Sequence, residues 1–95
     1  MVLETPYEMA LEAAKRFRLL RTPKNITMKA LSEKSGVPYS TIRRFESTGE
    51  ISFLALVKLT SAIGEDDQIT SLFSETVPAS IEEVIRENRI RKRLR

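Results

Sequence analysis

Two short helical segments joined at a glycine constrain the fold of this chain more than any other feature. The segments cover residues 27–35 and 38–46, and Gly36 lies between them. Glycine adopts the left-handed backbone conformation without the steric cost that other residues incur, so Gly36 can end the first segment abruptly. Ser32 is small, which leaves room for the second helix to approach the first closely. The pattern predicts a tight pair of crossing helices at residues 27–46.

Turn signals divide the rest of the chain into further helical segments, and no segment shows the alternation of a β-strand. Thr5-Pro6-Tyr7-Glu8 is a capping box with proline at the first helical position, and Ser52 is a good N-cap. The sequence therefore predicts an all-α fold with five helices, a short additional C-terminal helix and a basic tail. We expect helices from about residue 6 to Thr22, from Thr27 to Gly36, from Pro38 to Glu46, from Ser52 to Gly64 and from Glu65 to Phe73, and a C-terminal helix that opens at Ser80. We expect Ser47-Thr48-Gly49 to form a loop, because these residues are typical of turns.

Apolar residues at helical spacing predict the core. The residues expected to face inward are Tyr7, Ala10, Leu11, Ala14, Phe17 and Leu20 in the first helix, Leu31, Val37, Ile42 and Phe45 in the central pair, and Phe53, Leu56, Leu59 and Ile63 in the fourth helix.

Charged residues are distributed unevenly along the chain. Residues 15–44 hold nine basic side chains and one acid, whereas residues 45–85 hold eight acids and one lysine. The last ten residues hold six basic side chains and one acid. A basic segment within a folded domain is typical of a protein that binds a polyanion, although a solvated surface has the same composition.

The composition excludes several classes of protein. The chain has 95 residues with no cysteine and no histidine, which removes disulfides, thiolate metal sites and the usual catalytic base. Its length allows one compact domain. Because it has neither a long apolar run nor the pattern of a signal peptide, we expect a cytoplasmic protein without a membrane partner, metal or cofactor.

The central helix pair resembles the Cro/repressor-type (XRE) helix-turn-helix family, whose second helix enters the major groove of DNA. The resemblance covers about residues 13–73 and depends on the combination of matching positions. It implies a repressor-like DNA-binding domain at residues 1–74, with residues 75–95 as an extension, and an ion pair between Glu46 and Arg21. The matching residues are Thr27, Leu31, Ser32, Gly36, Val37, Ser40, Thr41, Ile42, Glu46 and Gly49.

Four positions of the second helix match those that the family uses against base edges. If Ile42 and Phe45 face the core, then Ser40, Arg43 and Arg44 face outward, and Tyr39 lies at the leading end of the helix, where its side chain can also reach outward. Arginine donates two hydrogen bonds to O6 and N7 of guanine, so the two arginines are the strongest candidates for reading bases, although Arg43 is equally suited to hold a phosphate. The four candidates are Tyr39, Ser40, Arg43 and Arg44.

The family also implies contacts to the DNA backbone and between two subunits. Met28 replaces the glutamine with which the family usually touches a phosphate. A recognition helix of this length reads few base pairs, so we expect a homodimer on half-sites about 34 Å apart. The candidates for phosphate contacts are Thr27, Met28, Lys29, Thr41 and Thr48, and those for the dimer contact are Ile69, Leu72 and Phe73, which are equally suited to a monomer core.

Two functions from different classes follow. The first is a sequence-specific regulator of transcription, a repressor that binds double-stranded DNA. The second is an antitoxin, because residues 43–52 and the basic end resemble regulators encoded beside HipA-type kinase toxins. The acidic segment and the C-terminal helix could hold such a toxin. An enzyme is the least favoured class, since no paired polar groups converge on a pocket.

Overall fold

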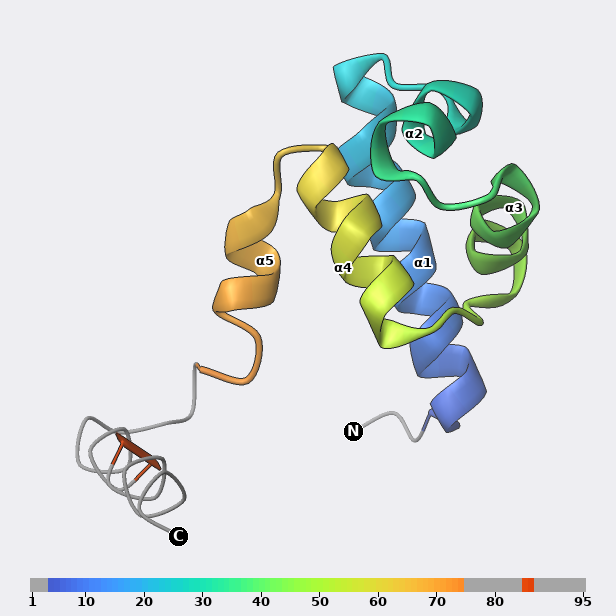
Figure 1. Cartoon of the computed structure of the whole chain (residues 1–95). Helices are drawn as coiled ribbons and strands as arrows, with labels where there is room; N and C mark the ends of the chain where they lie inside the picture. The colour runs from blue at the N-terminus through green and yellow to red at the C-terminus, as the bar shows by residue number, and fades with distance from the viewer. Residues whose placement is uncertain (1–3, 75–84, 87–95) are drawn as a thin grey trace, which may run out of the picture.

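The described part of the chain is all-helical, as predicted. A computed structural model describes residues 4–74 and 85–86, and within these residues it contains no strand. Figure 1 shows α1 to α4 packed together and α5 beside them. Residue 75, where the predicted extension begins, lies outside the described residues, and of the predicted C-terminal helix from Ser80 only Ile85 and Arg86 are described, both as helical. The elements are α1 (Pro6–Arg21), the 3-10 turn η1 (Thr22–Lys24), α2 (Met28–Ser35), α3 (Tyr39–Thr48), α4 (Phe53–Ala62) and α5 (Asp66–Thr70).

Side-chain caps set the starts of three helices. The Thr5 hydroxyl accepts a hydrogen bond from the Glu8 N–H at 3.1 Å, and the Glu8 carboxylate accepts one from the Thr5 N–H, which completes the capping box of α1. Thr27 and Ser52 cap α2 and α4 in the same way, each at 3.1 Å. These bonds satisfy backbone donors that have no partner within the helix. The three predicted N-caps are therefore confirmed.

Gly36 ends α2 in the left-handed conformation that the sequence predicts, with φ of 77°. Ser32 contributes more than its small size, because its hydroxyl donates to the Val37 carbonyl oxygen at 2.6 Å. The Ser35 hydroxyl accepts from the Val37 N–H at 3.1 Å. These bonds fix the turn between α2 and α3, so the direction of α3 is set locally.

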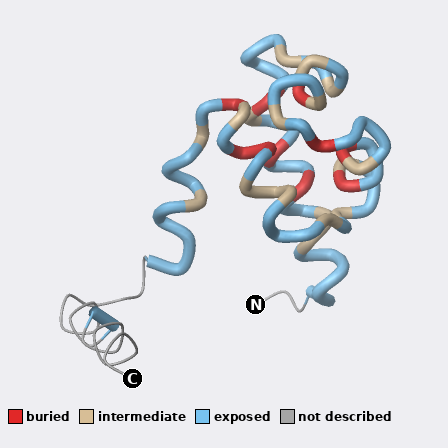
Figure 2. The backbone as a smooth tube through the Cα atoms, in the orientation of Figure 1, coloured by how far each residue is buried: buried red, intermediate tan, exposed pale blue. Residues whose placement is uncertain are grey.

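The core lies where α1, α2, α3 and α4 meet (Figure 2). Phe17 and Phe45 pack edge to face, with their ring centroids 5.5 Å apart. Burying such side chains is the main source of folding free energy. The buried apolar residues are Ala14, Phe17, Leu31, Val37, Ile42, Phe45, Leu59 and Ile63.

Two residues predicted to face inward are exposed instead. Tyr7 is 76% exposed, because it lies in the first turn of α1, which extends beyond the helices that pack on it (Figure 1). Phe53 is 59% exposed. It is the first residue of α4, and helical side chains lean toward the N-terminus, so this ring extends past the end of the core.

The predicted ends of α3 and α5 were wrong. Ser47 and Thr48 form the last turn of α3 rather than a loop, and both hydroxyls donate to the Arg44 carbonyl oxygen. In contrast, α5 stops at Thr70, three residues early. The Ser71 hydroxyl donates to the Asp67 carbonyl oxygen at 2.5 Å. Such local bonds can either extend a helix or compete with it, and the sequence alone does not distinguish the two outcomes.

Lys24 joins η1 to the junction between α4 and α5. Its Nζ donates to the Ile63 carbonyl oxygen at 2.9 Å and lies 2.9 Å from Oε2 of Glu65. The hydrogen bond from Lys24 and the charge of Lys24 lower the pKa of Glu65 below its ordinary value of 4.5. Because the folded-state pKa is lowered, this pair stabilises the fold fully above pH 4.5 and loses its effect as the pH falls through the lowered pKa.

We therefore predict that Lys24→Met lowers the melting temperature, and that the part of the loss due to Glu65 disappears in acid. The measurement is thermal unfolding of both proteins by circular dichroism at pH 7 and at steps below pH 4.5. The bond to the Ile63 carbonyl does not titrate, so a smaller difference persists at low pH. Lys34→Met is the control for removing a lysine charge. A difference that is the same at every pH contradicts the role of Glu65.

Candidate nucleic-acid interface

The α3 helix has a buried side and an exposed side, as its sequence predicts. Ile42 and Phe45 are buried in the core. Tyr39 is 45% exposed at the start of the helix. Ser40, Arg43 and Arg44 are exposed. All four candidate base-reading side chains are therefore accessible to a large ligand.

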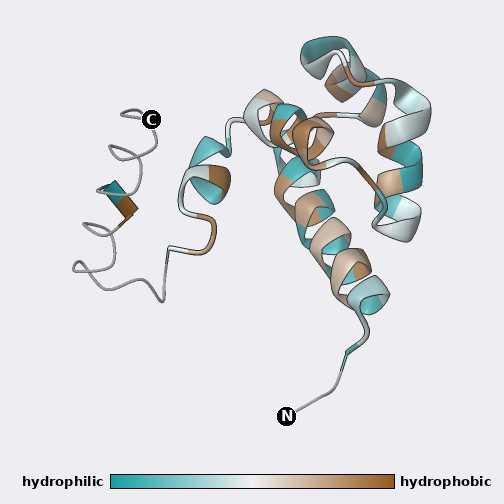
Figure 3. Ribbon diagram, turned by 60° about the horizontal axis from the view of Figure 1, so that its bottom comes forward, coloured by the Kyte–Doolittle hydropathy of each residue, from teal (hydrophilic) through white to brown (hydrophobic). Residues whose placement is uncertain are grey.

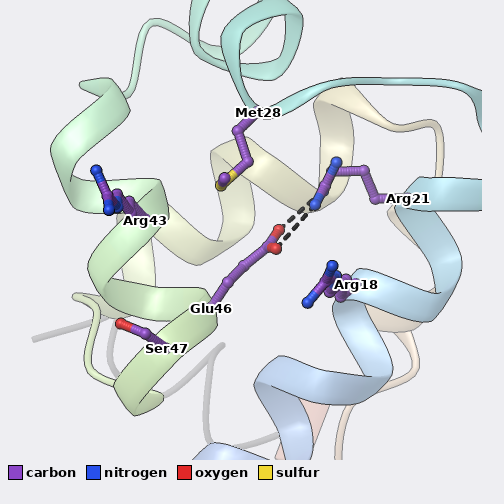
Figure 4. Close-up of a pocket in the computed structure, with 6 residues that line it drawn as sticks. All are labelled: Arg18, Arg21, Met28, Arg43, Glu46 and Ser47. Carbon is purple, nitrogen blue, oxygen red and sulfur yellow. Dashed lines mark hydrogen bonds and ion pairs between the residues drawn. The ribbon is translucent and has the colours of Figure 1, made fainter.

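A buried ion pair fixes α3 to α1. Nε of Arg21 lies 2.8 Å from Oε2 of Glu46, and Nη2 of Arg21 donates to Oε1 of Glu46 at 2.8 Å (Figure 4). Nη1 of Arg21 donates to the Ile26 carbonyl oxygen at 2.7 Å, just before α2. Both side chains are 8% exposed. The expected pair between Arg21 and Glu46 is confirmed, and it joins α1, α3 and the start of α2.

Arg43 lies at the edge of a hollow between α1, α2 and α3. Figure 4 shows Arg18 and Arg43 on opposite sides of the Arg21–Glu46 pair. The hollow has a volume of about 240 Å³. Its lining residues are Arg18, Arg21, Met28, Arg43, Glu46 and Ser47.

Arg44 has a different environment, because it is paired with Glu50 in the loop after α3. Nε of Arg44 donates to Oε2 of Glu50 at 3.0 Å, and Nη2 donates to the same oxygen. The Thr48 hydroxyl donates to the Arg44 carbonyl oxygen at 2.7 Å and accepts from the Glu50 N–H at 3.1 Å. Glu50 could not be predicted as the partner of Arg44, because it lies six residues from Arg44 across a helix end, outside the i+3 and i+4 spacing of helical pairs.

The candidate phosphate contacts differ in accessibility. Thr27, Lys29 and Thr48 are exposed, and Thr27 and Lys29 lie at the start of α2. Met28 is half-buried and packs against the core. Thr41 is also half-buried. The N-terminal end of α2 therefore offers backbone N–H groups, the positive end of a helix dipole and a lysine on one side.

The candidate dimer residues lie at the end of α5 and in the turn after it. Phe73 is 83% exposed and Leu72 is 41% exposed, whereas Ile69 is half-buried. Figure 3 shows hydrophobic residues at this end of α5. Leu72 and Phe73 thus do not belong to the monomer core, and they leave apolar surface exposed to solvent.

Ion pairs between the basic and acidic segments reduce the charge of both. Three of them join residues 15–44 to residues 45–85 in the described structure: Arg21–Glu46, Lys24–Glu65 and Arg44–Glu50. Within the same described residues, no group of His, Cys, Asp or Glu is arranged to hold a metal ion. None of the helices described there has the length and apolar character to span a bilayer.

A family model for the helix-turn-helix matches residues 17–69, which is more than half of the chain. No curated protein and no solved structure gives a significant match. The match to the family model and the exposed side of α3, which is the second helix of the motif, define the class of this protein. It is a DNA-binding regulator of transcription. The chain belongs to the Cro/repressor-type (XRE) helix-turn-helix family, a family of DNA-binding regulatory domains rather than enzymes.

Proposed function

We propose that this protein is a repressor that binds an inverted-repeat operator as a homodimer, with α3 in the major groove. The observation that carries the proposal is the two-sided α3 helix. It buries Ile42 and Phe45 and exposes Tyr39, Ser40 and Arg44. The buried Arg21–Glu46 pair fixes α3 to α1, so the exposed side chains stand on a rigid element, as specific reading requires.

The two arginines of α3 take different roles in this proposal. Arg44 reads a guanine, because bidentate donation to O6 and N7 is the commonest specific contact in the major groove. Arg43 holds a phosphate together with Arg18, since both border the hollow beside Met28. Lys29 and Thr27, with the backbone N–H groups of α2, hold a second stretch of the DNA backbone. Such contacts position the protein without reading sequence.

The exposed apolar end of α5 supports the dimer. Leu72 and Phe73 present apolar side chains to water, which is costly unless a second surface covers them. A two-fold contact there would bury the same residues on both subunits. The operator would then contain two half-sites about 34 Å apart, or one helical turn.

The alternative function, an antitoxin that holds a kinase toxin, has less support. Three of the eight acids of the acidic segment are already paired with basic residues of this chain, namely Glu46, Glu50 and Glu65. They are therefore not free to meet a basic partner. A cytoplasmic location, where such a regulator meets its DNA, stays a prediction.

Selection from a random pool of DNA duplexes tests the proposal. The full chain is incubated with the pool at two salt concentrations, and the bound duplexes are sequenced. An enriched inverted repeat with half-sites one helical turn apart supports the dimeric repressor. Binding that disappears with salt and enriches no sequence means that the basic surface holds phosphates only, and the proposal fails.

Arg44→Ala is expected to weaken binding to the selected operator by about 1–3 kcal/mol and to relax the preference at one base pair. The measurement is fluorescence anisotropy with the operator and with a scrambled duplex. Lys29→Ala is the matched control, because loss of a phosphate contact weakens binding to both duplexes and reduces the salt slope by about one. If Arg44→Ala weakens both duplexes equally, Arg44 does not read a base.

A further inference from the structure

Glu50 restricts the guanidinium of Arg44 to part of its hydrogen-bonding capacity. The guanidinium has five N–H donors, and Glu50 takes one from Nε and one from Nη2. The remaining donors are both N–H groups of Nη1 and the second N–H of Nη2. These form the end of the guanidinium fork, and two parallel bonds from that end match O6 and N7 of guanine.

Glu50 itself is held in place by the end of α3. Its N–H donates to the Thr48 hydroxyl at 3.1 Å, and that hydroxyl donates to the Arg44 carbonyl oxygen at 2.7 Å. Gly49, with φ of 84°, turns the chain so that Glu50 faces back toward the helix. The backbone of Glu50 is therefore held beside the last turn of α3, and from there its carboxylate reaches the guanidinium of Arg44. A guanidinium with one fixed partner loses less conformational freedom on binding than a free one.

The charge of Glu50 has a second effect. A carboxylate beside the reading arginine repels the phosphates of any duplex, and it offsets the attraction that the positive charge of Arg44 exerts on them. Arg44 without Glu50 would be a mobile cation that can attach to any nearby phosphate. A fixed carboxylate therefore weakens binding to unrelated DNA and keeps Arg44 directed at a base edge.

We propose that Glu50 is a positioning residue for base recognition, which holds Arg44 in the orientation that reads guanine and excludes it from phosphates. The inference rests on the proposed function, since it needs a DNA operator that Arg44 reads. It adds a specificity-determining residue outside the recognition helix.

The test compares the full chain with Glu50→Gln, which keeps the size of the side chain and removes its charge. Anisotropy gives the discrimination ratio, which is the dissociation constant of the operator changed at the base pair that Arg44→Ala affects, divided by that of the selected operator. We expect Glu50→Gln to lower this ratio by about fivefold or more and to tighten binding to scrambled DNA. Glu33→Gln, an exposed acid of α2, removes the same charge elsewhere and should leave the ratio unchanged.

A second comparison separates positioning from a general charge effect. In an Arg44→Ala background, Glu50→Gln should no longer change the ratio, because the residue through which Glu50 acts is gone. The melting temperature should stay near that of the parent, since an exposed pair contributes little stability. An unchanged ratio in the single variant, or the same fall in the Arg44→Ala background, overturns this inference and leaves the proposed function standing. If the parent enriches no sequence, the proposed function falls and the inference falls with it.

Discussion

Gly49→Ala is expected to destabilise the fold by about 2–5 kcal/mol, one of the two largest effects of a single substitution in this chain. Gly49 has φ of 84°, where a side chain costs about 1–2 kcal/mol. A Cβ there would also lie 2.5 Å from the carbonyl carbon of Ala10 and 2.6 Å from the backbone nitrogen of Leu11. These are backbone atoms inside α1, so they cannot move aside without breaking helical hydrogen bonds, and overpacking of this kind costs about 1–3 kcal/mol.

Gly64→Ala is the matched control for this prediction. Gly64 has φ of 75°, but nothing lies within 4 Å of the position that its Cβ would take. The variant should therefore lose only the conformational part, about 1–2 kcal/mol. Urea unfolding followed by circular dichroism measures both variants. Equal losses at the two positions would show that the contact between Gly49 and α1 does not limit stability.

Local features of the sequence were sufficient to predict most of the fold. The N-caps Thr5, Thr27 and Ser52 and the turn at Gly36 depend on bonds within a few residues, so their patterns are visible in the sequence. The inward positions of Ile42 and Phe45 follow from helical periodicity in the same way.

Features that depend on where a helix meets its neighbours were not predictable. Tyr7 and Phe53 have the spacing of core residues, yet each lies in a first turn that extends past the packed region. Ser47 and Thr48 are typical of loops, but their hydroxyls bond to the last turn of α3 and extend it. Periodicity gives the face on which a residue lies and leaves open whether a neighbouring helix reaches that part of the face.

The sequence was sufficient to predict which side chains of the candidate site are exposed, but not the different surroundings of its two arginines. The sequence places Arg43 and Arg44 together on the exposed side of α3 as candidates to read a base, with Arg43 equally suited to hold a phosphate. Their surroundings differ in the structure, because Arg43 borders the hollow shared with Arg18 and Arg44 pairs with Glu50. This distinction arises from a residue of α1 and a residue beyond a helix end, so neighbouring sequence carries no signal for it.

Glu46→Ala is expected to cost about 3–5 kcal/mol, because it leaves a buried guanidinium without its anionic partner. Arg21 is 6% exposed, and only the Ile26 carbonyl oxygen would remain among the acceptors it has now. Water cannot easily replace the two bonds that Glu46 accepts at 2.8 Å. Urea unfolding at pH 7 measures the loss, and Glu50→Ala is the matched control, since the exposed Arg44–Glu50 pair is worth about 0–1 kcal/mol.

The double variant Arg21→Met with Glu46→Leu separates the net worth of the pair from the cost of isolating one charge. Replacing both partners with apolar residues of similar volume leaves no unpaired charge, so the double variant should recover much of the stability that Glu46→Ala loses. If the double variant is as unstable as Glu46→Ala, the pair itself stabilises the fold and its removal cannot be compensated by packing. The double variant could instead recover stability and lose operator discrimination. That result would mean that the ion pair serves chiefly to set the orientation of α3 against α1. The two guanidinium–carboxylate bonds fix this orientation, whereas apolar contacts leave it free.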